Sequence, residues 1–261
     1  MATDRNQPRA PTLVLHKITE ILDVFSVEAP EPTLQQIIHR TRLPSSTCQR
    51  LVQDMVHEGL LDRAGDRYRI GISLVRWSVP GTLGLDVVQL VSPILRDLRD
   101  VTGETACLYV RDGGFRTVVA VAETRHVVMR PFMVGMVMPL HAGAPGKVFL
   151  AFDPQAWTAL AESDLVAFTP DTPTSLQRLH EQVADTKRLG YYAAFGERNS
   201  DVGSISAPVF NHVGVLAGVL GLGFPAQRVM QADVARLGPM VVDAAAEASK
   251  RLGFDPRTHT A

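Results

Sequence analysis

The chain has 261 residues, of which 46% are hydrophobic and 20% charged, a globular composition with room for two domains. Its 26 lysines and arginines are balanced by 27 acids, so the net charge of -1 excludes a wholesale polybasic binder and leaves only local basic patches. The two cysteines, Cys48 and Cys107, are too few for a disulfide framework or a cysteine-based metal site. We therefore expect a reducing, cytoplasmic location.

Neither the N-terminal segment nor the longest apolar run of the chain predicts membrane insertion. Residues 1–12 are polar with two prolines and contain no apolar signal-peptide core, which predicts a disordered tail. The longest apolar run, Val213 to Phe224, is short and broken by four glycines. We expect no membrane partner.

The first third of the chain has the periodicity of three helices followed by a hairpin. Apolar residues at helical spacing predict a helix over Leu13 to Phe25, and Thr33 with Gln36 forms a capping box before a short helix over Leu34 to Arg40. After a four-residue link, a third helix ends at Glu58 before Gly59. Two period-two runs around Ala64-Gly65-Asp66 then predict a β-hairpin over Leu60 to Ile70. This order is typical of a winged helix-turn-helix.

The third helix has two chemically different faces, with Cys48, Leu51, Val52 and Met55 opposite Ser46, Gln49, Arg50 and Gln53. An ordinary amphipathic surface helix has the same pattern, so the neighbouring charges must decide. No acid lies between Arg40 and Arg50, and arginines outnumber acids in the hairpin. We therefore predict contacts to duplex DNA in a major groove from Thr33, Arg40, Ser45, Ser46, Thr47, Gln49, Arg50, Arg63 and Arg67.

Several of these residues have plainer interpretations. Ser46 could cap its own helix with Gln49 reaching back, and Arg63 and Arg67 could be solvated hairpin charges. Cys48 is expected in the core rather than as a reactive thiol.

The remaining two thirds mix strands and helices. A connector over Ile72 to Val91 is interrupted by Pro80, Gly81 and Gly84, which predicts a hinge, and a helix covers Pro93 to Asp100. Asp112-Gly113-Gly114 joins two strands as a hairpin over Glu104 to Glu123. Further strands are expected at Val127 to Pro131, Tyr191 to Phe195, Ser204 to Asn211 and Val215 to Gly223. Further helices are expected at Lys147 to Phe152, at Leu176 to Leu189 between a Thr174 cap and Gly190, and at Asp233 to Leu252. This mixture indicates an α+β domain.

No motif in this part supports catalysis. Gly143 to Lys147 resembles a phosphate loop, but the position of its first glycine is His141 and Val148 replaces the Ser/Thr that holds magnesium. The serine in GSISA lacks the closing glycine of a nucleophile elbow. His141 has no second ligand at metal spacing, so a structural hydrogen bond is favoured. We expect no cofactor, no metal and no enzyme activity.

The chain resembles the IclR family of bacterial transcriptional regulators over nearly its whole length. The resemblance rests on TRLPSSTCQRLVQDMVHEGLLDRAGDRYRIG in the first part, and on PLHAGAPGK, LGYYAAFGE and SISAPVFNHVGVLAGVLGL in the second. Two positions depart from the family pattern, because Arg42 stands where a glycine is usual and Ser45 where a basic residue is frequent.

The resemblance implies a two-domain fold: a mainly-α winged helix-turn-helix domain over residues 13–78, a connector helix over 79–91, and an α+β GAF-like effector-binding domain over 92–261. It also implies a homodimer, with tetramers as dimers of dimers, on operator DNA. Its effector pocket maps onto Ala144, Pro145, Ala194, Ser204, Gly221 and Gly223.

The mapped pocket positions carry few polar side chains. This favours a small organic effector that is larger or more aromatic than a keto acid. Cys107, Tyr109, Met129, Met133 and Met138 could form its apolar wall, although methionines at such spacing are more often plain core. The predicted effector-binding residues therefore also include Met129 and Met138.

The sequence thus predicts an effector-responsive DNA-binding regulator, either activator or repressor. The alternative is a GAF-like enzyme that converts a small molecule, with an N-terminal domain that docks protein. Redox enzymes of that kind need neighbouring cysteines, and this half of the chain has Cys107 alone.

Overall fold

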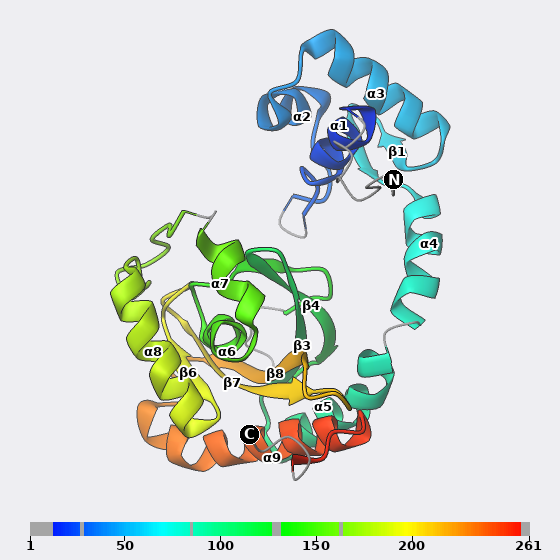
Figure 1. Cartoon of the computed structure of the whole chain (residues 1–261). Helices are drawn as coiled ribbons and strands as arrows, with labels where there is room; N and C mark the ends of the chain where they lie inside the picture. The colour runs from blue at the N-terminus through cyan, green and yellow to red at the C-terminus, as the bar shows by residue number, and fades with distance from the viewer. Residues whose placement is uncertain (1–12, 27–28, 84–85, 127–131, 162–163, 257–261) are drawn as a thin grey trace, which may run out of the picture. The chain divides into compact units, whose positions relative to one another are not determined.

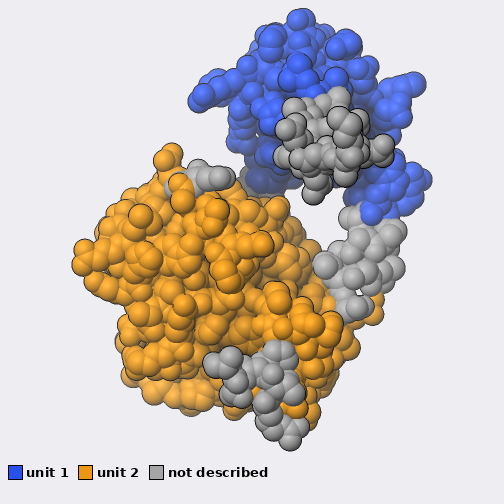
Figure 2. All heavy atoms as spheres, viewed as in Figure 1, with its two compact units in different colours: residues 1–82 blue, residues 83–261 orange. Residues whose placement is uncertain are grey.

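The computed structural model describes residues 13–26, 29–83, 86–126, 132–161 and 164–256. The chain divides into two compact units, residues 1–82 and 83–261 (Figure 2). Within the described ranges, no helix is both long and apolar enough to cross a membrane.

The first unit is a winged helix-turn-helix (Figure 1). Its elements are α1 (Leu13–Leu22), α2 (Leu34–Thr41), α3 (Ser45–His57), β1 (Leu61–Ala64), β2 (Arg67–Ile70) and α4 (Ile72–Leu83). The apolar stripes of the first three helices and the wing meet in one core around Ile21, Ile37, Val52 and Leu61. The predicted helices and hairpin are confirmed to within about three residues.

The caps of α2 and α3 differ in kind. Thr33 and Gln36 form the predicted capping box, with Thr33 N donating to Gln36 Oε1 at 2.8 Å and Gln36 N to Thr33 Oγ1 at 3.3 Å. The N-cap of α3 is Pro44, which has no side-chain hydrogen bond to the helix. Ser46 lies inside the first turn, so the alternative in which Ser46 caps its own helix is wrong.

The second unit is built on a six-stranded antiparallel sheet in the order β5-β4-β3-β8-β7-β6. Its strands are β3 (Thr105–Asp112), β4 (Phe115–Ala122), β5 (Val137–Pro139), β6 (Tyr192–Phe195), β7 (Val202–Phe210) and β8 (Leu216–Pro225). Its helices are α5 (Asp86–Thr102), α6 (Ala144–Phe152), α7 (Pro154–Ala161), α8 (Leu176–Leu189) and α9 (Val234–Arg251), with a 3₁₀ turn at Gln231–Asp233. The predicted α+β architecture is confirmed.

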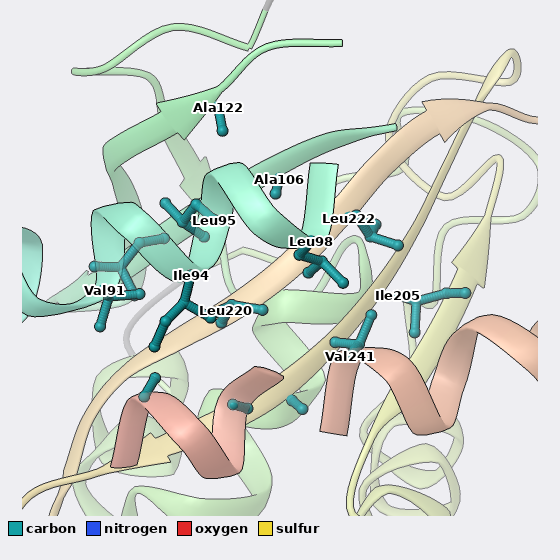
Figure 3. Packing of buried hydrophobic residues seen from close by; sticks show 14 of the residues in the cluster. Val91, Ile94, Leu95, Leu98, Ala106, Ala122, Ile205, Leu220, Leu222 and Val241 are labelled. Carbon is teal, nitrogen blue, oxygen red and sulfur yellow. The ribbon is translucent and has the colours of Figure 1, made fainter. Parts of the chain in front are cut away.

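The two faces of the sheet carry different layers. Helices α5 and α9 cover one face, where Leu95, Leu220 and Val241 belong to the larger apolar core (Figure 3). Helices α6 and α8 lie over the other face, where Tyr109 and Phe149 are buried. Because side chains alternate along each strand, Ser204, Gly221 and Gly223 face the α6 side.

Two predictions about the connector need correction. Helix α4 continues through Pro80 and Gly81, so these residues do not interrupt it. Helix α5 begins at Asp86 rather than Pro93, because Val87 and Val91 extend its buried apolar stripe towards the N-terminus. That burial outweighs the cost of a proline inside a helix, about 3 kcal/mol.

Other boundaries also differ. Helix α6 begins at Ala144 instead of Lys147, and Ser175 rather than Thr174 caps α8 by accepting from Arg178 N at 3.2 Å. The predicted strand Val127 to Pro131 lies outside the described residues. Strand β5 and helix α7 were not predicted, because a three-residue strand and an eight-residue helix give little periodic signal.

Candidate functional site

The exposed face of α3 is the candidate DNA-contacting surface of the first unit. Ser45, Ser46, Gln49 and Arg50 are exposed, and Thr47 is half-buried. Cys48, Leu51, Val52 and Met55 are buried on the opposite face, as predicted. The hydrophobic positions of α3 therefore fix which side chains remain in solvent.

The first turn of α3 also leaves backbone donors available. Its first backbone hydrogen bond runs from Cys48 N to Pro44 O at 3.0 Å, and Pro44 provides no side-chain acceptor. The amides of Ser45, Ser46 and Thr47 are thus those that a helix leaves without an intrahelical acceptor. Amides at a helix N-terminus favour an anion such as a phosphate.

Three of the predicted arginines already have an internal partner. Arg40 donates to Val24 O at 3.1 Å, Arg63 to Gly65 O at 3.0 Å, and Arg67 to Glu31 O at 2.9 Å. The hydroxyl of Thr33 serves the capping box. An arginine that donates to one carbonyl keeps other N–H donors, so these bonds orient the three side chains without removing them from the surface.

Arg42 and Arg50 are exposed, and within the described residues their side chains have neither a hydrogen bond nor an ion pair. Arg42 ends α2 in the left-handed region, at φ +55°, a conformation that L-residues adopt at an energetic cost. Arg42 is not among the DNA contacts predicted from the sequence. The sequence feature that could have identified Arg42 is its position in a turn that a glycine would adopt more easily.

The candidate effector site of the second unit is a row of residues across three strands. Ala194 on β6 pairs with Ser204 on β7, which pairs with Gly223 on β8. The Ala144 amide at the start of α6 donates to Ser204 Oγ at 3.1 Å. The structure therefore brings together Ala144, Ala194, Ser204 and Gly223, with Pro145 beside them in α6 and Gly221 two residues along β8.

The two glycines of this row allow close approach from above the sheet. A Cβ on Gly223 would lie 2.4 Å from Cε2 of Phe132, so an aromatic ring rests directly on this backbone. A Cβ on Gly221 would lie 2.1 Å from Ser206 Oγ. The Ser206 hydroxyl is fully buried and has no hydrogen-bond partner in the described part of the chain.

A buried ion pair supports the loop that carries Ala144. Lys147 donates to Glu197 Oε2 and to His141 O, the latter at 2.6 Å, while Gly143 N donates to the same carboxylate at 2.6 Å. Glu197 also accepts from Gln182 at 3.5 Å. The carboxylate thus fixes the loop to the end of β6.

Arg116 adds a second buried cation beneath the same loop. It donates to Pro139 O and to Ala142 O, the latter at 2.7 Å. Burial lowers the pKa of Arg116 to about 10 and the pKa of Lys147 to about 8, because a charged side chain loses its hydration there. Two buried cations thus lie near one buried carboxylate, and the surroundings of the loop favour negative charge.

His141 and Met138, a residue of the predicted apolar wall, make contacts that stabilise the fold. His141 Nε2 lies 2.9 Å from Val166 O, which confirms the predicted structural hydrogen bond, and its ring stacks on Phe168. Met138 is buried with its sulfur 3.9 Å from Arg116, whereas Met133 is partly exposed and Met129 lies outside the described residues. No group of three or more potential metal ligands occurs in the described ranges.

The buried thiol of Cys107 does not suit redox chemistry. It is fully buried, and burial raises the pKa of Cys107 to about 12. The reactive thiolate is therefore disfavoured at neutral pH.

Sequence reasoning missed Arg116, Lys147, Glu197 and Phe132 as parts of this site. Lys147 was noticed only as part of a failed phosphate loop. Its position inside the apolar segment APGKVFLAF was the available signal, because a lysine buried among apolar residues requires an acidic partner. The identity of that partner, Glu197, is set by the tertiary fold.

Family comparisons cover both units. Residues 82–250 match the family described as bacterial transcriptional regulator IclR C-terminal, and residues 14–65 match the IclR helix-turn-helix domain. The chain is 28% identical to the HTH-type transcriptional regulator XynR of Escherichia coli K12, over 92% of this chain and 97% of that one. It is 29% identical to the HTH-type transcriptional regulator BhcR of Paracoccus denitrificans, over 93% and 88%.

Solved structures give the same picture of the fold. An IclR homolog from Microbacterium hydrocarbonoxydans, crystallised with 4-hydroxybenzoate, aligns with a TM-score of 0.76 at 25% identity, covering 92% of this chain and 98% of that one. An IclR transcriptional regulator from Alicyclobacillus acidocaldarius aligns with a TM-score of 0.80 at 23% identity, covering 94% and 100%. The second likeness shows the shared two-domain architecture.

Proposed function

Because the chain belongs to the IclR family, whose members are transcriptional regulators rather than enzymes, we propose that its DNA contacts come from the exposed face of α3 and the wing. The observation that carries this proposal is the uncapped first turn of α3, with Ser45, Ser46, Gln49 and Arg50 exposed around it. Arg42 joins the contacts predicted from sequence as a partner for a backbone phosphate. Regulation of chromosomal DNA places the protein in the cytoplasm.

A salt series tests this surface. Duplex containing the promoter-proximal DNA of the chain's own gene is titrated at increasing salt, and affinity should fall steeply because phosphate contacts release counterions. The matched variant Ser46→Asp places a carboxylate at the first turn of α3 and should abolish binding while leaving the fold intact. Wild-type affinity that does not depend on salt would contradict the proposal.

The chain works as a homodimer in this proposal, with dimers of dimers as a further assembly. One recognition helix contacts too few bases for specificity, and a two-fold pair reads two half-sites. Apolar side chains on α1 and α4 support pairing of the first units, since Leu13 is 65% exposed and Trp77 is 56% exposed. Trp77→Glu should shift the protein from dimer to monomer in sedimentation measurements.

The effector of this proposal is a small organic molecule that is larger or more aromatic than a keto acid. Ala194, Gly221 and Gly223 provide no side-chain donors. The backbone of Gly223 already packs against the aromatic ring of Phe132. The likeness to the homolog crystallised with 4-hydroxybenzoate is a second, weaker support. Differential affinity for two arrangements of the chain would then couple binding to operator affinity.

Calorimetry of the full chain tests this effector class. We expect saturable binding of 4-hydroxybenzoate or a related aromatic acid, and weak binding of glyoxylate and pyruvate. Phe132→Ala should alter the affinity for the aromatic acid, whereas Phe115→Ala, an exposed residue at the start of β4, should leave it unchanged. Tight binding of the small keto acids would contradict the proposal.

A further inference from the structure

A hollow in the C-terminal unit has no residue in common with the row Ala194, Ser204 and Gly223. Its volume is about 880 Å³. Its walls are formed by α9, by the C-terminal ends of α6 and α8, and by the second half of β7. We refer to it as the α8–α9 cavity, and its size falls within the range of small-molecule sites.

The edge of β7 in this cavity is not paired with β6, because β6 pairs with β7 only from Gly203 to Ser206. A peptide strand could not use this edge well. Pro208 has no N–H, and Phe210 N donates to Ser249 Oγ at 2.9 Å. Ser249 in turn donates to Ala245 O at 2.7 Å. The missing donors disfavour strand addition and favour a small molecule as the occupant.

Three aromatic rings line the cavity in a chain of contacts. Phe152 and Phe210 meet edge to face with their centroids 5.8 Å apart, and Phe210 and Phe254 meet at 5.2 Å. All three are only half-buried, so part of each ring remains open to the hollow. Val242 and Ala246 add aliphatic wall from α9. Ring faces and edges at these spacings suit a further planar aromatic group.

Five charged side chains line this cavity, two of them lysines and three of them acids. Lys187 and Lys250 are exposed, and their side chains have no hydrogen-bond or ion-pair partner within the described residues. Glu247 is paired with Arg251 at 2.9 Å, and Asp255 has an interaction of its own within the chain. Of the lining acids, Asp243 remains without a partner in the described ranges. The ammonium groups of Lys187 and Lys250 are therefore available to pair with a ligand carboxylate.

We propose that the α8–α9 cavity is a second ligand site, which binds a small aromatic carboxylate with its ring among the three phenylalanines and its carboxylate at Lys187 and Lys250. This site is independent of the proposed effector site over Gly223. The aromatic part provides the apolar contact, and the two lysines provide the preference for an anion.

The test is calorimetric titration of the full chain with 2-naphthoate and with its neutral analogue 2-naphthamide. Ala246→Trp fills the cavity from an exposed position on α9, and Ala235→Trp, exposed on the same helix outside the cavity, is the matched control. We expect Ala246→Trp to weaken 2-naphthoate binding at least about tenfold and Ala235→Trp to leave it unchanged. Circular dichroism establishes that both variants are folded.

A second pair of variants tests the charge assignment. Wild type should bind 2-naphthoate more tightly than 2-naphthamide, and Lys187→Gln with Lys250→Gln should remove this preference. Lys187→Arg with Lys250→Arg should retain it. Equal binding by the Ala246→Trp and Ala235→Trp variants would place any bound naphthoate elsewhere and overturn the proposal. Absence of saturable binding below millimolar concentration would also overturn it.

Discussion

The polar groups of α3 and those around the α6 loop occupy opposite environments. The side chains of Ser46, Gln49 and Arg50 remain in solvent without a partner among the described residues, whereas Lys147 and Glu197 are buried and bonded to each other. A surface that meets a polyanion must keep its donors available, while a pocket for a small ligand needs its backbone amides held in place. The difference predicts that substitutions in the first region change binding, and substitutions in the second change folding.

The largest expected effect comes from Lys147→Met. This variant leaves the buried Glu197 carboxylate unpaired and should lower the free energy of unfolding by about 3–5 kcal/mol, measured by chemical denaturation. The double variant Lys147→Met with Glu197→Gln removes both charges and should recover a large part of the loss. A single variant as stable as wild type would show that the pair does not hold the loop.

The pH dependence of wild type and Lys147→Met should also differ. Burial lowers the pKa of Lys147 from 10.5 to about 8, so the folded state releases its proton before the unfolded state does. The burial penalty is fully present below pH 8 and is relieved as the pH rises towards 10.5. Wild type should therefore gain stability across this window relative to the variant, and parallel profiles would contradict the lowered pKa.

Arg50→Ala tests the exposed side of the comparison. We expect operator affinity to fall by about 1–3 kcal/mol in gel-shift titrations, with no change in the unfolding midpoint, because Arg50 has no internal partner within the described residues. Arg236→Ala, exposed on α9, serves as the control. An equal loss on operator and on random duplex would identify Arg50 as a phosphate contact rather than a base reader.

Thr33 lies between the two classes, since it is both a cap and a predicted DNA contact. Thr33→Ala should lower the free energy of unfolding by about 1 kcal/mol through loss of the capping box. Thr33→Ser keeps the capping hydroxyl and should restore that stability. If the alanine variant were as stable as wild type but bound DNA less well, the contact would be the main role.

The smallest expected effect, and the only one in which stability and binding move in opposite directions, comes from Arg42→Gly. Relief of the left-handed backbone should raise the free energy of unfolding by less than about 1 kcal/mol. Loss of one phosphate contact should reduce the slope of log affinity against log salt by about 0.9. An unchanged salt slope would remove Arg42 from the contact surface.

Local sequence patterns predicted most of the fold. The helical spacing of apolar residues predicted the buried face of α3, and Asp112-Gly113-Gly114 predicted the hairpin between β3 and β4. The start of α5 is not predicted correctly, because a proline such as Pro93 commonly begins a helix, whereas tertiary burial extends this helix back to Asp86. Elements of three to eight residues, such as β5, are decided by their neighbours rather than by their own periodicity.

The candidate sites were predictable to different degrees. The proposed DNA contacts follow from one helix face and its adjacent charges, so they can be proposed from the sequence alone. The environment of the effector site depends on Arg116 and Glu197, which are distant in the chain from Lys147 and meet it only in the folded protein. A single sequence contains no local pattern that pairs them.

The hydrogen bond from the Ala144 amide to Ser204 has a consequence for the energetics of ligand entry. A ligand that accepts from this amide must first release the serine hydroxyl, so its arrival exchanges one acceptor for another instead of adding a bond. The enthalpy of that exchange is small, and affinity then depends on the apolar surface removed from water. Calorimetry over a range of temperatures should therefore give a clearly negative heat-capacity change on binding.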